Sequence, residues 1–415
     1  MPRESINSLE QLNSWKSFEY PFLWLSAAGI AVTMIWLPLI NAMMCICFLL
    51  LWLYYRRLHF EFSFLLVLWI SVYLITAVSF FYSENRSEAL RILQLKLPLL
   101  VFPLIFASGI NWKKEQIRLL LLLFSWSVGI FCVFTIGNAL LLAFSSGNIQ
   151  SLFGYKIIPF KFVYASVISL FCVFGTVIQL YDLSRKKQIR TEHLFLLLLF
   201  WITLILLSNR MGLLLSSIIT IYFLFGMVRS VIMKGAVAAI LFTVFISLYN
   251  WNNTFREKIQ VITNLNSSQM IQLDENASLD RTWDGLQLRW AIWNCAAGAI
   301  KKHFWIGTGV GDAQQTLQQT YEQRKFYFAS KYNTYNAHNQ FLEQWLMTGI
   351  AGFLAFFLYL AISLIQSIRN RRVFYTLFLV VFTAFCFTES VLEVSKGVVW
   401  FSFFNSIFAF SDRGE

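Results

Sequence analysis

The chain has 415 residues, of which 58% are hydrophobic and only 13% are charged, and its mean hydropathy is +0.62. Soluble globular domains are about half apolar and about one quarter charged. This composition therefore excludes an ordinary soluble protein and indicates an integral membrane protein. The formal net charge of +12 would fit a nucleic-acid partner if the basic residues were clustered.

The chain begins with a polar segment, residues 1–19. This segment is too polar for a secretory signal and contains no small-residue cleavage site. We therefore expect it to be retained as a cytoplasmic tail. The last four residues, 412–415, are expected to form a second cytoplasmic tail.

Twelve apolar stretches follow, each a candidate membrane-spanning helix. Such a helix needs about 20 mostly apolar residues, with about 17 to 25 tolerated. The first two stretches are one apolar segment divided at Pro38, and the fourth is short and contains Pro98 and Pro103. We expect nine spans in residues 20–249 and three in residues 341–411. The predicted spans are 20–36, 38–55, 62–82, 96–109, 117–144, 160–181, 192–208, 211–228, 232–249, 341–367, 373–389 and 397–411.

The basic residues predict the orientation of these spans. Lys and Arg in short loops are retained on the cytoplasmic side. If the N-terminus is inside, the inner segments hold seventeen basic residues and the short outer loops hold seven. Both ends of an all-α polytopic protein are therefore expected in the cytoplasm. The positive charge then reports topology, and a nucleic-acid partner is not expected.

Residues 250–340 form the one long hydrophilic segment, and this topology places it outside, which is the periplasm if the cell is Gram-negative. Loops of this length in a compact fold are usually functional or disordered. This segment is aromatic and regularly patterned, which indicates structure. An amphipathic helix lying on the membrane surface is predicted. Its apolar residues at helical spacing are Leu286, Trp290, Trp293, Ala297 and Ile300.

Two arginines on the outer side are candidate functional residues. Arg210 lies between two apolar stretches, where an arginine costs about 2.5 to 3.5 kcal/mol on insertion scales and is often functional. The alternative is an anchor whose side chain extends to the membrane surface. Arg289 precedes Trp290 on the predicted amphipathic helix, and it could instead be a surface charge paired with Asp280 or Asp284.

His338 is the third candidate. A lone histidine is often only a hydrogen-bonded structural residue, but its usual pKa, about 6.5, also suits proton transfer. Asn339 follows it, and Gly349 and Gly352 follow after nine further residues. These glycines would allow close helix packing. The glycine-rich run 307–312 resembles a phosphate-binding loop only superficially, because no Lys-Ser/Thr follows it, so a turn is expected there.

Together these features resemble the O-antigen ligase superfamily of bacterial membrane glycosyltransferases. That superfamily includes lipopolysaccharide O-antigen ligases, some O-antigen polymerases and protein O-oligosaccharyltransferases. The resemblance covers residues from about 195 to 410. The matching elements are His338-Asn339-x9-Gly349-x-x-Gly352, Asn209-Arg210-Met211-Gly212, and Arg289-Trp290-x-x-Trp293 followed by Gly307-x-Gly309.

The resemblance implies a GT-C-like fold and transfer of a glycan from undecaprenyl diphosphate to an acceptor hydroxyl. The reaction would take place on the periplasmic face of the inner membrane, without a nucleotide sugar, a metal or another cofactor. Lipid A-core is the preferred acceptor, because the His338 element most closely resembles the ligase form. A growing polysaccharide and a protein hydroxyl are the alternatives.

The same resemblance implies a role for each candidate residue. Arg210 and Arg289 would neutralise the diphosphate, since a guanidinium pairs bidentately with phosphate. His338 would accept the proton of the acceptor hydroxyl. Asn339 and Tyr335 would contact the substrate, although Tyr335 could equally pack against the membrane domain.

Metal-independent transfer also has an argument in the sequence. The external segment contains seven acidic residues but no Asp-x-Asp pair. No Cys/His cluster has metal-ligand spacing either, since Cys295 is the single cysteine outside the predicted spans. The arginines are expected to supply the positive charge instead.

Two other classes of function stay open. A transporter or flippase would place Arg210 and Lys96 in a substrate cavity. The sequence shows no clear internal repeat, however, and a transporter rarely needs a patterned external segment of this length. A structural assembly protein would leave the His338 element without a purpose. Replacement of His338 distinguishes these classes, because only catalysis should be lost.

Overall fold

The computed structural model describes residues 20–55, 63–110, 112–186, 190–227, 285–331 and 333–411, with four isolated residues between 235 and 246. Within these ranges the chain is helical and contains no β-strand, which confirms the predicted all-α class. Three sets of predictions lie outside the described residues. They are the two cytoplasmic tails, most of the span 232–249, and the first part of the external segment, 250–284.

Every predicted span within the described ranges overlaps a helix. The helices of the first half are α2 (Pro21–Thr33), α3 (Pro38–Tyr55), α4 (Phe64–Val78), α5 (Arg86–Lys96), α6 (Pro98–Ala107), α7 (Lys114–Ser146), α8 (Ala165–Lys186), α9 (Thr191–Leu207) and α10 (Arg210–Met227). Those of the second half are α13 (Gly285–Lys302), α14 (Ala313–Gln323), α15 (Tyr327–Ser330), α16 (Gln340–Arg369), α17 (Val373–Cys386) and α18 (Ser395–Ser406). Short helical turns are η1 (Ser79–Tyr82), η2 (Ile149–Leu152), η3 (Tyr155–Ile157), η4 (Val391–Glu393) and η5 (Ile407–Ser411).

Six helical segments among the described residues are long and apolar enough to cross a membrane. They are α3, α4 with η1, α5 with α6, α7, α8 and α16. Helices α2, α9, α10 and α17 are apolar but shorter. The complete set of twelve spans therefore stays a prediction.

The fourth predicted span differs from the observed helices. The prediction began at Lys96, whereas the polar helix α5 already begins at Arg86. The side chain of Asn85 caps this helix by accepting a hydrogen bond from the backbone N–H of Glu88. Helix α6 then begins at Pro98, because the ring of a proline suits the first helical position.

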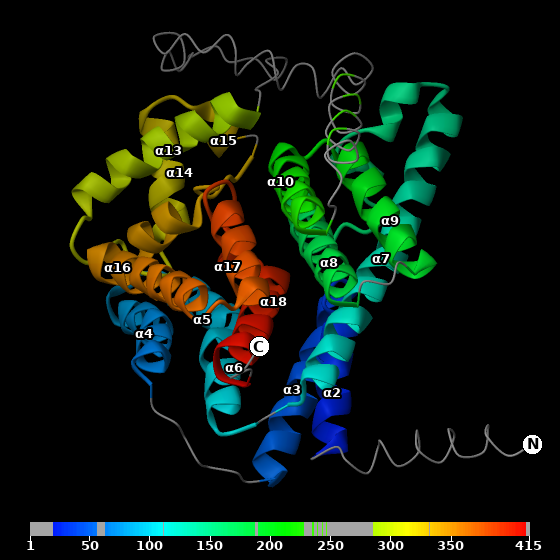
Figure 1. Ribbon diagram of the computed structural model, residues 1–415. Helices are drawn as coiled ribbons and strands as arrows, with labels where there is room; N and C mark the ends of the chain where they lie inside the picture. The colour runs from blue at the N-terminus through cyan, green and yellow to red at the C-terminus, as the bar shows by residue number, and fades with distance from the viewer. Residues whose placement is uncertain are drawn as a thin grey trace, which may run out of the picture.

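The core is unusually aromatic. Helix α18 packs on α6, its rings also contact those of α4 and α17, and every residue from Lys396 to Ser406 is buried (Figure 1). The rings of Phe382 and Phe401 are stacked with centroids 3.7 Å apart, and Phe401 also stacks on Trp69. Such pairs add to the burial of apolar area, so α18 is fixed in the centre of the fold.

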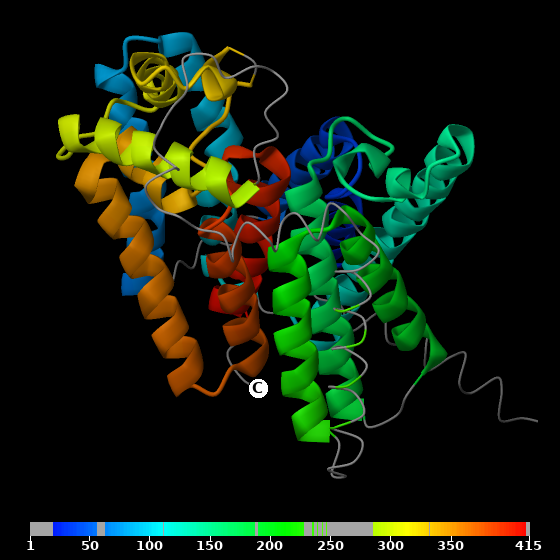
Figure 2. The same ribbon diagram turned by 90° about the horizontal axis from the view of Figure 1, so that it is seen from above.

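Helices α13, α14 and α15 form a cap over one end of this core. Figure 2 shows α13 in yellow-green lying across the upper ends of α16 and α17 rather than parallel to them. The predicted helix is thus confirmed as α13, whereas its place on the membrane surface stays a prediction. The side of α13 facing the protein consists mainly of small residues, including Ala291, Cys295 and Ala299, whereas Trp290 stays 50% exposed.

Helix α16 is interrupted at Gly349, where φ is 67° and ψ is −165°. This backbone conformation is accessible essentially only to glycine. A Cβ on Gly349 would lie 2.2 Å from the carbonyl oxygen of Trp305, so the chain after α13 also needs a glycine here. Gly349 was expected to allow close packing between helices. Instead it allows α16 to approach the segment that follows α13.

Candidate active site

His338 lies in the connection that leads into α16, with φ at 43°. Its backbone N–H donates to the Asn336 side chain, and its carbonyl oxygen accepts a hydrogen bond from the indole N–H of Trp293, 3.4 Å away on α13. The side chain of His338 is 25% exposed. Its Nδ1 atom lies 3.2 Å from Oε2 of Glu389.

Asn339 begins helix α16 as its N-terminal cap. Its Oδ1 atom accepts hydrogen bonds from the backbone N–H groups of Phe341 and Leu342, and its Nδ2 donates to the carbonyl oxygen of Phe387. All of these bonds satisfy groups within the protein. The geometry therefore gives Asn339 a structural role, and its contact with a substrate stays a prediction.

Arg289 reaches from α13 to the connection between α17 and η4. Its Nε donates to the carbonyl oxygen of Thr388 at 2.9 Å, and Nη1 donates to that of Gly285 at 3.2 Å. Its Nη2 forms an ion pair with Oε1 of Glu389. The side chain of Arg289 is 26% exposed. The alternative partners Asp280 and Asp284 lie outside the described residues.

Glu389 joins the two candidates, because one carboxylate oxygen faces His338 and the other faces Arg289. Burial alone would raise the pKa of Glu389. The hydrogen bond with His338 and the charge of Arg289 outweigh burial and hold that pKa below its ordinary value. We name Arg289, His338 and Glu389 the outer cluster.

The sequence interpretation missed Glu389, because it placed this residue at the end of the predicted span 373–389. A signal was available. An acidic residue at the outer end of an apolar stretch is a natural partner for an arginine and a histidine assigned to the same side. The helix α17 in fact ends at Cys386, which leaves Glu389 in the following connection.

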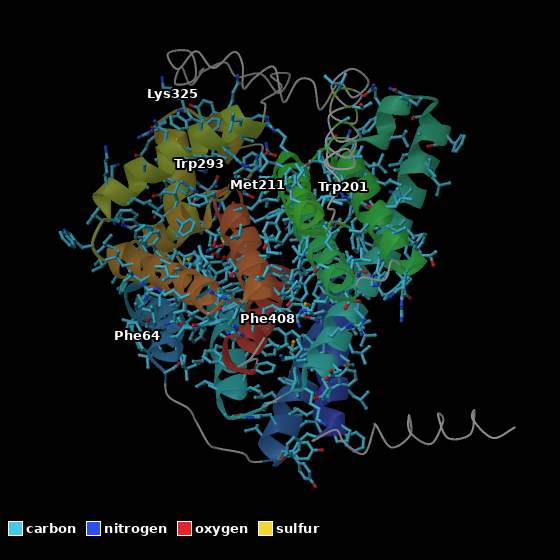
Figure 3. All side chains as sticks on the ribbon, viewed as in Figure 1. Phe64, Trp201, Met211, Trp293, Lys325 and Phe408 are labelled. Carbon is cyan, nitrogen blue, oxygen red and sulfur yellow. The ribbon has the colours of Figure 1, made fainter. Side chains whose placement is uncertain are left out.

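Arg210 is the first residue of α10, which Asn209 caps by accepting a hydrogen bond from the N–H of Gly212 at 2.8 Å. The position that a Cβ on Gly285 would occupy lies 3.5 Å from Nη2 of Arg210 and 3.3 Å from Nη1 of Arg289. Two guanidinium groups from different helices therefore approach one glycine. Figure 3 labels Met211, which follows Arg210, and Trp293, which lies on the same helix as Arg289. Both lie in the upper half of the molecule in this view.

Tyr335 lies beside the imidazole, with 5.4 Å between the ring centroids of Tyr335 and His338. Its carbonyl oxygen accepts hydrogen bonds from the side chains of Gln314 and Gln318 on α14. Helix α14 thus holds the connection that carries both rings. The structure brings together Arg210, Arg289, Tyr335 and His338, whose proximity the sequence could not establish.

A second charged cluster lies deeper in the protein. Nζ of Lys96 is 2.6 Å from Oε1 of Glu393, and the same oxygen accepts a hydrogen bond from the Gln340 side chain at 3.1 Å. The carboxylate of Glu343 accepts from the backbone N–H of Ala337 at 2.9 Å. We name Lys96, Gln340, Glu343 and Glu393 the inner cluster. The residues Lys96, Gln340 and Glu343 are each less than 5% exposed.

The glycine-rich run 307–312 forms a turn, as expected. Its backbone N–H groups donate to the protein itself, with that of Val310 bonded to Ser79 and that of Gly311 bonded to Ser83. The carboxylate of Asp312 accepts hydrogen bonds from the two backbone N–H groups preceding α5, at 2.8 and 2.9 Å. This run therefore attaches the cap to α5 and has no N–H groups left to hold phosphate there.

Among the residues that the structure describes, no three His, Cys, Asp or Glu side chains come close enough to hold a metal ion. The outer cluster contains one imidazole and one carboxylate, and Arg289 already neutralises that carboxylate. Metal independence stays a prediction, which a chelator can test.

A comparison with protein families gives a match to part of the chain. Residues 195–357 match the sequence model of a family described as O-Antigen ligase. This range includes Arg210, Arg289 and His338 but ends before Glu389. No curated protein matches the chain. Members of this family are glycosyltransferase-like enzymes of the ligase or polymerase type. The predicted resemblance to the O-antigen ligase superfamily is thus confirmed over residues 195–357.

Proposed function

We propose that the protein transfers a glycan from undecaprenyl diphosphate to the hydroxyl group of an acceptor. The observation that carries this proposal is the bridge formed by Glu389 between His338 and Arg289, with Arg210 nearby. A proton acceptor and two cations therefore meet at one place. This combination suits removal of a proton from a hydroxyl and departure of a diphosphate.

The contact with Glu389 supports Nε2 of His338 as the proposed base. An ionised carboxylate can only accept hydrogen bonds, so the proton of the neutral imidazole is on Nδ1, facing Glu389. The lone pair on Nε2 is then available. In the transfer step Nε2 takes the hydroxyl proton, the acceptor oxygen bonds to the anomeric carbon, and the diphosphate leaves with the electron pair.

The arginines would bind the diphosphate. Departure of this group develops negative charge, which preorganised cations stabilise without rearrangement. Arg289 is held on three sides by Gly285, Thr388 and Glu389. Arg210 adds a second guanidinium beside Gly285. Together they would supply the charge that many glycan transferases obtain from a divalent ion.

We further propose that the acceptor is lipid A-core, which makes the enzyme an O-antigen ligase. Deletion of the gene should leave complete polymers on undecaprenyl diphosphate and bare cores. Gel separation of the glycolipids tests this assignment. Cores that carry a single repeat unit would indicate a polymerase instead, and unchanged lipopolysaccharide with unglycosylated periplasmic proteins would indicate a protein transferase.

The proposed reaction also requires a defined topology, with twelve spans in the inner membrane, both ends in the cytoplasm and residues 250–340 in the periplasm. Single cysteines near positions 185 and 265, in a background without native cysteines, test this arrangement. An impermeant thiol reagent added to intact cells should label position 265. Labelling at position 185 would overturn the topology.

The catalytic proposal is tested with purified protein and a lipid-linked glycan donor. His338→Ala should lower the transfer rate by about 100 to 10,000-fold, the usual contribution of a general base, while thermal stability stays near that of the wild type. His303→Ala is the matched control, because His303 is exposed on the cap. Full transfer by His338→Ala would exclude the proposed base.

The same assay tests the arginines and the absence of a metal. Arg210→Lys and Arg289→Lys should both transfer poorly, because lysine cannot pair bidentately with phosphate. A chelator should leave the rate unchanged. Loss of activity with the chelator and its return with a divalent ion would refute charge neutralisation by arginines alone.

A further inference from the structure

The segment that follows α13 exposes large apolar side chains. Trp305 is 75% exposed and Ile306 is 65% exposed, and Phe304 beside them is 36% exposed. Phe81 at the end of η1 is 73% exposed. We name Phe81, Phe304, Trp305 and Ile306 the apolar tip. Contiguous exposed apolar residues of this kind usually mark a surface that binds a partner or a membrane.

The backbone of this segment is held in place. The carbonyl oxygen of Phe304 accepts hydrogen bonds from the N–H of Ile350 at 3.0 Å and from the indole of Trp345 at 3.2 Å. The hydroxyl of Tyr82 donates to the carbonyl oxygen of Ile306 at 2.5 Å. The exposure is therefore a feature of the folded structure.

These hydrogen bonds fix the apolar tip between two candidate membrane spans. Tyr82 is the last residue of the span formed by α4 and η1, and Ile350 follows the interruption of α16 at Gly349. Figure 1 shows the chain leaving α13 at the left edge of the molecule and passing down beside α16. The tip therefore lies where one apolar span ends and beside the interruption of another.

The outward faces of both helices continue into the apolar tip. Leu74 and Val78 on α4 are 50% and 59% exposed, and Leu354 and Phe357 on α16 are 43% and 46% exposed. A membrane-spanning protein covers such faces with lipid. An apolar surface that continues them is expected to enter the same lipid.

Two lysines adjoin the tip. Lys301 and Lys302 form the last turn of α13 and are exposed. Lysines at this position also interact favourably with the C-terminal end of a helix dipole, which alone would require no ligand. Beside an apolar surface at the end of one span and the interruption of another, however, they would lie at the depth of lipid headgroups, where cationic side chains attract anionic phosphate.

We propose that the apolar tip inserts into the outer part of the bilayer and that Lys301 and Lys302 bind the phosphate groups of anionic lipids. This membrane anchor lies at the opposite end of α13 from Arg289. The helix rises about 1.5 Å per residue, so the anchor sets the depth at which the other end presents Arg289. The inference goes beyond the proposed function, because no step of glycan transfer enters it.

The test uses the full chain, without its native cysteines, reconstituted into vesicles of phosphatidylcholine. A fluorophore attached at Trp305→Cys reports contact with lipid, and Lys325→Cys, exposed elsewhere on the cap, is the matched control. Trace phosphatidylcholine or phosphatidylglycerol that carries a quenching spin label near the headgroup is then added. We expect quenching at position 305 to exceed that at position 325.

The anionic quencher should act more strongly than the zwitterionic one at position 305, by up to about fivefold for each lysine. Lys301→Gln with Lys302→Gln should bring this ratio to one, and raised salt should lower it. The thermal stability of the double variant serves as the readout for a role confined to the helix dipole. A small loss of stability with an unchanged quenching ratio would overturn phosphate binding.

Equal quenching at positions 305 and 325 would overturn insertion of the apolar tip. Quenching is read without any transfer reaction. Failure of the membrane-anchor proposal is therefore distinguishable from failure of the proposed catalytic function.

Discussion

Glu389 and Glu393 lie four residues apart in the same connection, yet their surroundings differ sharply. In the outer cluster, Glu389 pairs with Arg289 and His338, which keep 26% and 25% of their side chains exposed. In the inner cluster, Glu393 pairs with Lys96, whose side chain is only 2% exposed. The cation and the imidazole of the outer cluster can meet a ligand, whereas the cation of the inner cluster is enclosed by protein.

This difference in exposure assigns the outer cluster to the proposed chemistry and the inner cluster to stabilising the fold. Gln340 links the two levels, because its Oε1 accepts a hydrogen bond from the N–H of Leu392 while its Nε2 donates to Glu393. The inner cluster therefore fixes the connection that carries Glu389 to the first turn of α16, directly after His338. A buried charge costs free energy unless it is paired, so each inner residue requires the others.

The largest expected effect comes from breaking the inner cluster. Lys96→Met should destabilise the fold by about 3 to 5 kcal/mol, because it leaves a buried carboxylate without its cation. Thermal unfolding in detergent measures this change. The matched control is Lys156→Met, at an exposed position. Adding Glu393→Gln to Lys96→Met should recover part of the loss, and full stability of Lys96→Met alone would contradict the assigned role.

The next largest effect is expected at the interruption of α16. Gly349→Ala should destabilise the protein by about 1 to 3 kcal/mol from backbone strain alone, with a further loss from the contact with Trp305. Gly137→Ala in α7 is the control, because a Cβ there meets no neighbouring atom. Similar unfolding temperatures for these two variants would show that the backbone at Gly349 is not restrained.

The smallest expected effect is the pH dependence of the stability that Glu389 contributes in the outer cluster. The pKa of Glu389 lies below its ordinary value of 4.5 in the folded protein. Its pairing therefore stabilises the fold fully above pH 4.5, and this contribution is lost as the pH falls through the lower, folded pKa. The stability difference between wild type and Glu389→Gln should shrink as the pH is lowered below 4.5. A stability difference between wild type and Glu389→Gln that grows below pH 4.5 would contradict the lowered pKa of Glu389.

Much of the fold could be predicted because apolar stretches and helices report the same physical requirement. A backbone in lipid must satisfy its own hydrogen bonds, so each apolar run within the described residues became a helix. Helix α5 escaped prediction because it is polar. Its stability comes from the Asn85 cap and from Asp312, which is distant in the sequence.

The sequence predicted individual residues of the candidate site but not which of them lie near one another. His338, Arg210 and Arg289 were selected for their chemistry, and the structure brings them near one another through three different elements. Glu389 and the inner cluster were missed because their meaning depends on contacts across the fold. Lys96 and Glu393 are 297 residues apart in sequence, and no local pattern pairs them.

The central claim is that Glu389 acts through His338, and a double-mutant cycle tests it most directly. The value of kcat/KM for glycan transfer is measured for wild type, His338→Ala, Glu389→Gln and the double variant. We predict that Glu389→Gln lowers kcat/KM much more when His338 is present than when His338 is alanine, where only the support of Arg289 by Glu389 is lost. The same fold reduction in both backgrounds would contradict the coupling.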